Sequence, residues 1–159
     1  MEDTRVAEDS RTDLERIYRE HGERLWRSVL LFSGDPDVAS DAVAEAFAQA
    51  LRRGAELRSP DRWVWRTAFR IARGMLKERR RMSPDPPEPA YEMPLGAAEL
   101  MADLGGLSPI QRAAIVLHYY GDLPVRETAA LLGSTQAAVR VHLHRARRRL
   151  KALLEDRDD

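Results

Sequence analysis

The chain has 159 residues, no cysteine, and 26 acidic residues balanced by 26 basic ones. The lack of cysteine excludes disulfides and cysteine-ligated metal sites, and it is typical of a reducing compartment. No apolar run approaches the roughly 20 residues that span a bilayer, and the stretch from Met1 to Arg19 is too charged for a signal peptide. We therefore expect a cytoplasmic protein of one or two small domains.

The net charge of zero hides segments of strong and opposite charge. The stretch from Arg66 to Arg81 holds seven basic residues and one acidic residue, and the stretch from Arg140 to Lys151 holds six basic residues and no acidic one. Residues 82–109 hold five acidic residues and no basic one. Two basic segments on one chain predict two contacts with a polyanion.

The first segment predicts one long helix. Residues 1–11 are polar and lack apolar periodicity, so we expect them to be disordered. The helix is expected to begin near Asp13 and to end at Gly34. Its apolar residues recur at helical spacing and should face a core: Leu14, Ile17, Tyr18, Leu25, Val29 and Phe32.

Two more helices follow, each opened by a capping residue and a proline. Asp35-Pro36 opens the second helix, which ends at Gly54, and Ser59-Pro60 opens the third, which runs to about Arg81. One face of the second helix is apolar, and its opposite face carries Asp37, Asp41 and Glu45. This acidic face is either merely solvated or a docking surface for a partner.

The third helix combines a basic face with aromatic residues in its first turn. Five basic residues recur at spacings of three and four, which places them broadly together: Arg66, Arg70, Arg73, Lys77 and Arg80. Trp63 and Trp65 suit core or capping positions, but an aromatic ring beside a basic face can also stack on an unpaired base.

A proline-rich segment then separates two domains. Five prolines between Met82 and Pro94 exclude a helix or a central strand there. We expect a first domain at residues 12–82, a Pro-rich acidic linker at residues 83–96, and a second domain at residues 97–155. No segment has β character, so the predicted class is all-α.

The second domain ends in the pattern of a helix-turn-helix. A short helix from about Gly96 to Leu104 comes first, and Ser108-Pro109 opens another that ends with Gly121 at its C′ position. The stretch from Pro124 to Leu150 then predicts a short helix, a turn at Gly133, and a long basic helix. Residues after Leu154 are expected to form an acidic tail.

The long basic helix predicts a reader of duplex DNA. Ala129 is small enough for a close helix crossing, Gly133 suits the turn, and Val139 can face the first helix. Gln136 and Arg140 are the best candidates for base edges, because Gln pairs with adenine and Arg with guanine. The residues expected to meet DNA are Thr135, Gln136, Ala137, Arg140, Val141, His144, Arg145, Arg147 and Arg148.

No motif in the sequence favours catalysis. It contains no Gly-rich phosphate loop, HExxH motif or nucleophile elbow, and the four histidines lack the spacing of metal ligands. We expect no enzymatic activity, no cofactor and no metal site.

Taken together, the two halves resemble a bacterial extracytoplasmic-function (ECF) RNA polymerase sigma factor over about residues 13–154. Leu107-Ser108-Pro109 and residues 117–121 resemble the lead helix of sigma region 4, and residues 131–133 and 139–150 resemble its reader helix. Gly34-Asp35, residues 41–47 and residues 63–81 resemble region 2.

The resemblance implies promoter-specific transcription initiation. In this family the second helix of region 2 binds the β′ clamp helices of core polymerase, which implies contacts at Asp37, Asp41, Ala44, Glu45 and Ala48. The third helix meets the −10 element, which implies contacts at Trp63, Arg66, Arg70, Arg73 and Lys77. Region 4 reads the −35 element as duplex and rests on the polymerase β flap. Many members are held inactive by an anti-sigma factor.

The chain departs from the family pattern at three positions. Members often have Gln in place of Ala44, often Asn in place of Arg70, and usually Gly in place of Ala137.

Two other functions remain open from the sequence. One is an ordinary helix-turn-helix regulator, which would bind a palindrome as a dimer. The other is a sigma-like protein-interaction module that does not bind DNA.

Overall fold

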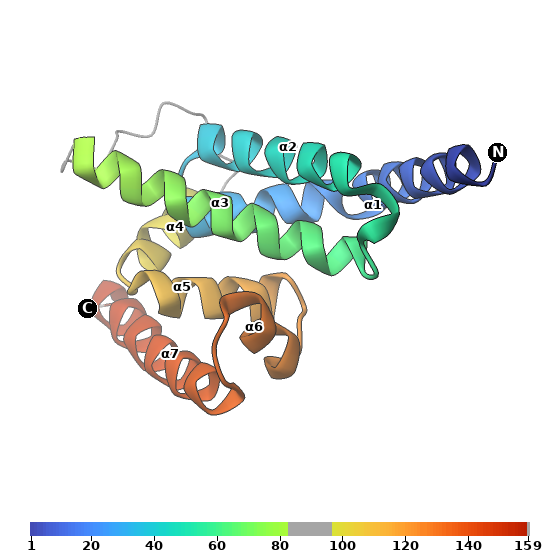
Figure 1. Cartoon of the computed structure of the whole chain (residues 1–159). Coiled ribbons are helices and arrows are strands. Elements are labelled where there is room, and N and C mark those ends of the chain that lie inside the picture. Colours follow the sequence, from blue (N-terminus) through green and yellow to red (C-terminus); the bar gives the residue numbers. More distant parts are fainter. Residues whose placement is uncertain (83–96, 159) are drawn as a thin grey trace. The chain divides into compact units, whose positions relative to one another are not determined.

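The computed structural model describes residues 1–82 and 97–158, and helices are the only regular elements within these ranges (Figure 1). This agrees with the predicted all-α class. The chain divides into two compact units, Met1–Pro86 and Pro87–Asp159. The linker predicted at residues 83–96 lies outside the described residues.

Three helices build the first unit. They are α1 (Glu2–Ser33), α2 (Pro36–Arg53) and α3 (Pro60–Met82), with a short 3-10 turn, η1 (Gly54–Glu56), after α2. Each long helix contacts the other two, and they lie alongside one another in Figure 1. The predicted apolar stripes meet in the core, where Leu25, Val29, Val38 and Val64 are fully buried.

The expected disorder of residues 1–11 is wrong, because α1 begins at Glu2. The N-terminal turns of α1 extend past the ends of α2 and α3 (Figure 1), and their side chains are exposed. Apolar periodicity reports the burial of one helix face, so it does not reveal a helix that is solvated all round. Glu2 and Asp3 lie in the first turn, where negative charge complements the helix dipole.

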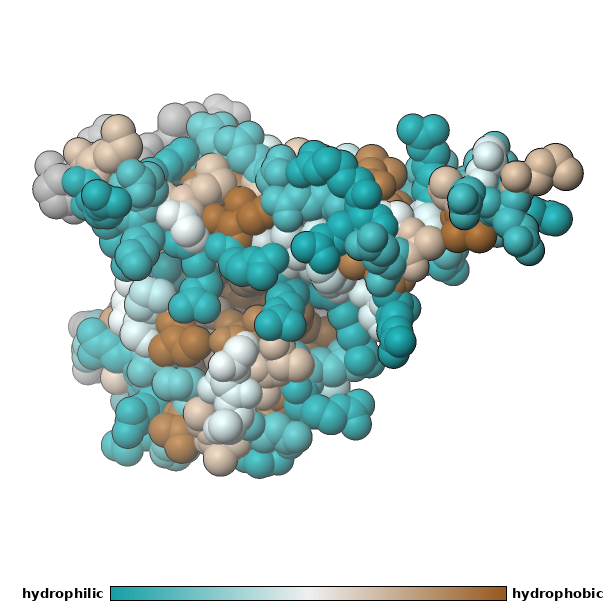
Figure 2. All heavy atoms as spheres, viewed as in Figure 1, coloured by the Kyte–Doolittle hydropathy of each residue, from teal (hydrophilic) through white to brown (hydrophobic). Residues whose placement is uncertain are grey.

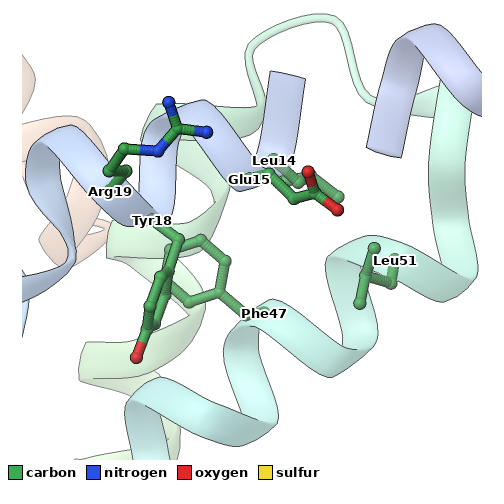
Figure 3. Close-up of a pocket in the computed structure, with 6 residues that line it drawn as sticks. All are labelled: Leu14, Glu15, Tyr18, Arg19, Phe47 and Leu51. Atoms are coloured by element: carbon green, nitrogen blue, oxygen red, sulfur yellow. The ribbon is translucent and has the colours of Figure 1, made fainter. Parts of the chain in front are cut away.

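Tyr18 lies at the margin of the core, with 60% of its surface exposed. Its ring meets the ring of Phe47 edge-on, with centroids 5.2 Å apart. Both rings line an open apolar groove between α1 and α2, together with Leu14 and Leu51 (Figure 3). Helical spacing alone therefore overstates the burial of Tyr18.

Asp35 connects the start of α2 to the end of α3. Its Oδ1 accepts hydrogen bonds from the backbone N–H groups of Asp37 at 2.9 Å and Val38 at 3.3 Å, as the predicted cap requires. Its Oδ2 forms an ion pair with Arg79. The sequence predicted the cap, but the ion pair joins residues 44 positions apart and has no local signal.

Replacing this residue should destabilise the first unit. We expect Asp35→Ala to lower the free energy of unfolding by about 1–2 kcal/mol, the upper range for a lost N-cap. Asp35→Asn keeps a capping oxygen and loses only the ion pair, so it should cost less. Denaturant unfolding of the full chain measures both changes, with Asp41→Ala as a control at an exposed acid of the same helix. An equal loss for Asp41→Ala and Asp35→Ala would contradict the assignment.

The second unit consists of shorter helices and one long C-terminal helix. Its elements are α4 (Ala97–Gly105), α5 (Pro109–Ile115), the π-helical turn η2 (Val116–Tyr120), α6 (Val125–Leu132) and α7 (Gln136–Asp158). Ser108 and Gln111 form a reciprocal capping box at the start of α5. Helices α5 and α6 contact each other, and both contact α7.

Gly121 follows the last helical residue, as predicted, but its conformation differs from the expected left-handed cap. The N–H of Gly121 donates to the carbonyl of Val116 at 2.8 Å, which closes a wide π turn. Gly121 is consequently right-handed, with φ of −73°, and Asp122 takes the left-handed conformation at φ 56°. The acidic tail expected after Leu154 is helical, because α7 continues as an exposed helix to Asp158.

Candidate nucleic-acid interface

The turn between α6 and α7 has the local geometry that the sequence predicts. Gly133 is left-handed at φ 62° and ψ 35°, and the N–H of Ser134 donates to the carbonyl of Ala129 at 2.9 Å. Thr135 caps α7, since its Oγ1 accepts from the N–H of Ala138 at 3.1 Å. These bonds fix the direction in which α7 leaves the turn.

Packing decides which side of α7 remains available to a ligand. Val139, Leu143 and Ala146 are at most 2% exposed and face the core of the second unit. The predicted DNA-facing side chains are all exposed: Thr135, Gln136, Ala137, Arg140, Val141, His144, Arg145, Arg147 and Arg148. Gln136, Arg140, His144 and Arg147 follow one another at spacings of four, four and three, so the structure brings them to one side of the helix.

Arg147 has a partner that sequence reasoning did not identify. Its Nη1 donates a hydrogen bond to the hydroxyl of Tyr119, and its Cζ lies 5.8 Å from the centroid of the Tyr119 ring. The two residues are 28 positions apart, and Tyr119 belongs to the unpredicted π turn. Within the sequence Tyr119 is one apolar residue among several, so no local signal could have revealed the pair.

A second basic surface lies on α3 of the first unit. Arg66, Arg70, Arg73 and Lys77 are exposed, whereas Val64, Ala68 and Phe69 are buried on the opposite side. The visible surface over α2 and α3 in Figure 2 is mainly hydrophilic, with scattered apolar residues. Further along the helix, Arg79 forms the ion pair with Asp35 and therefore has a structural partner within the first unit.

The tryptophans of α3 occupy two different surroundings. Trp63 is partly exposed and lies under the guanidinium of Arg53, whose Cζ is 5.4 Å from the ring centroid. The ring of Trp65 stacks on that of Phe69, with an interplanar angle of 11°. Trp63 thus combines a partly exposed aromatic surface with an adjacent cation.

The acidic face of α2 is exposed, as the sequence predicts. Asp37, Asp41, Ala44 and Glu45 are exposed, and Ala48 is partly exposed. Glu45 Oε1 accepts hydrogen bonds from Gln49 at 3.0 Å and Arg52 at 3.1 Å. These bonds, the one from Gln49 first, hold the pKa of Glu45 below its usual value.

The described residues hold no group of three or more His, Cys, Asp or Glu side chains arranged to bind a metal ion. No helix among them is long and apolar enough to cross a membrane.

Comparison with known proteins places both units in one family. A family model described as Sigma-70, region 4 matches residues 98–150, which contain the helix-turn-helix. The RNA polymerase sigma-E factor of Streptomyces antibioticus is 31% identical over 96% of this chain and 91% of its own length. The ECF RNA polymerase sigma factor SigE of Mycolicibacterium smegmatis is 27% identical over 88% of this chain, which spans 61% of that protein.

A solved structure extends the similarity to the fold. CnrH, in complex with the cytosolic domain of CnrY, aligns with a TM-score of 0.74 and 25% identity over 96% of this chain and 94% of its own. The family is not enzymatic, which agrees with the absence of catalytic motifs in the sequence. The chain belongs to the extracytoplasmic-function family of RNA polymerase sigma factors, which direct the initiation of transcription.

Proposed function

We propose that the chain recruits core RNA polymerase and directs it to promoters by reading two elements with its two units. On this proposal α7 reads the −35 element as duplex in the major groove, and α3 contacts the opened −10 element. The acidic face of α2 docks on the β′ clamp helices, and the second unit rests on the β flap. The linker at residues 83–96 then sets the separation of the two units on polymerase.

One observation carries this proposal most directly. The side of α7 that is free of the core holds Gln136 and Arg140 within the first turns after the Thr135 cap. A helix enters the major groove with its N-terminal residues against base edges, which supports the proposal that these two side chains read bases. On the same proposal the arginines further along α7 contact phosphates.

The acidic face supports the docking part of the proposal. Asp37 and Asp41 are exposed on the same helix as Ala44, and the hydrogen bonds to Glu45 hold that carboxylate in a fixed orientation. Asp41→Arg should therefore weaken core binding without unfolding the chain. Gel filtration with purified core polymerase tests this, and Asp61→Arg, at an exposed acid on α3, serves as the control.

The function itself is tested by run-off transcription. Core polymerase with this chain should produce transcripts from promoters that core polymerase alone does not use. Binding to core without any promoter-specific transcript would instead favour a protein-interaction module. A stable dimer by light scattering that binds a palindrome without polymerase would favour an ordinary regulator.

The affinity of the second unit for its duplex should depend steeply on salt. If about five phosphates are neutralised, the slope of log K against log salt should be roughly −4.5. Arg145→Ala should reduce the magnitude of this slope by about 0.9, the share of one phosphate. Gln136→Ala removes no charge and should leave the slope unchanged, which makes it the matched control. Equal slopes for Arg145→Ala and the parent would show that Arg145 does not contact the DNA phosphate backbone.

We further propose that the chain acts in the cytoplasm and that a protein inhibitor of the anti-sigma type controls it. The family membership supports both statements, and the structurally similar CnrH forms a complex with the cytosolic domain of CnrY. Co-purification of the chain at native expression levels tests the proposal of an inhibitor.

A further inference from the structure

We infer that Tyr119 is a positioning residue that holds Arg147 in place for a phosphate of the promoter backbone. This inference rests on the proposed reading of duplex DNA by α7. It assigns a function in DNA binding to a residue outside the helix-turn-helix.

The π turn η2 gives Tyr119 a fixed position. Val116 and Leu117 are buried in the core, so the turn that they anchor has little freedom to move. The Nδ1 atom of His118 lies 2.7 Å from the carbonyl oxygen of Leu123, and the His118 ring meets the Tyr119 ring edge-on at 4.8 Å. Tyr119 is therefore supported by its neighbours although 53% of its surface is exposed.

Because Tyr119 is held in position, its contact with Arg147 also restricts the Arg147 side chain on α7. Arg147 follows His144 by three residues on the exposed side that also holds Arg140. An arginine side chain on a solvated helix face samples many rotamers, and ordering it on binding opposes association. The phenol oxygen accepts one of its five N–H groups and leaves the others for phosphate oxygens. Tyr119 thus reduces the conformational entropy that the Arg147 side chain loses when DNA binds.

The test measures the affinity of the holoenzyme for a promoter fragment that contains the −35 element, at constant salt. Arg147→Ala should weaken binding about tenfold, the effect of one charged hydrogen bond. Tyr119→Phe should weaken it about threefold, because the guanidinium keeps its charge and loses only its anchor. In the Arg147→Ala background, Tyr119→Phe should have no further effect. Tyr120→Phe, at the neighbouring and less exposed tyrosine, is the matched control.

Three outcomes would overturn the inference: additive losses in the double variant, unchanged binding by Arg147→Ala, or tighter binding by Tyr119→Phe. The last would mean that Tyr119 holds Arg147 away from DNA. Thermal unfolding of Tyr119→Phe should match the parent, which separates positioning from a loss of fold. A parent holoenzyme that starts no transcript would refute the proposed function, whereas an active parent with additive variants would refute only the inference about Tyr119.

Discussion

Leu143→Ala is expected to lower the free energy of unfolding of the second unit by about 2–5 kcal/mol, the largest effect of any single change considered. Leu143 is 2% exposed, and its side chain lies between Val139 and Ala146 on the core-facing side of α7. Truncation leaves a cavity where α7 meets α5 and α6, the helices that hold it in position. The reader helix would then lose its fixed orientation, although its DNA-facing residues are unchanged.

Denaturant unfolding of the full chain, together with hydrogen exchange of the α7 amides, measures this effect. Val141→Ala is the matched control, because Val141 lies on the same helix and is 46% exposed. The control should change stability by less than about 0.5 kcal/mol. Similar losses for the two variants would show that α7 is not anchored through this face.

Arg140→Ala is expected to weaken binding to the −35 duplex by about 1–3 kcal/mol and to relax specificity at one base pair. Arg140 is exposed, lies one turn after Gln136, and has the long planar donor group that pairs with guanine. If Arg140 reads a base as proposed, its loss removes that contact. The fold should stay intact, because the core packing of this part of α7 comes from the neighbouring Val139.

Selection of preferred −35 sequences by the holoenzyme measures the change in specificity. Arg148→Ala is the matched control, since Arg148 is exposed on the same helix and is proposed to contact phosphate. The control should weaken binding to all sequences alike. If both variants weaken binding uniformly, Arg140 does not read a base.

Local chemistry explains why much of the fold could be predicted from the sequence. Asp35, Ser108 and Thr135 each cap a helix within three residues of their own position, and Gly133 adopts the expected left-handed turn. Such signals depend on near neighbours along the chain. The exposed side of α7 followed directly from the apolar spacing of its opposite side.

The features that could not be predicted depend on distant residues or on the absence of burial. The N-terminal end of α1 and the C-terminal end of α7 are helical but solvated, so no apolar pattern marks them. The π turn at Val116–Tyr120 leaves Gly121 right-handed and places the left-handed conformation one residue later, at Asp122. The pairs Asp35–Arg79 and Tyr119–Arg147 join separate helices through tertiary packing, which no sequence spacing encodes.

Mapping of transcript starts after expression of the chain, in parallel with Arg140→Ala, tests the proposal of a two-element reader most directly. The parent should activate a set of promoters that share one −35 motif and one −10 motif at a fixed spacing. Arg140→Ala should broaden the −35 motif at a single position and leave the −10 motif unchanged. A parent that activates no shared promoter motif, or a variant that activates the same set with the same motif, would contradict the proposal.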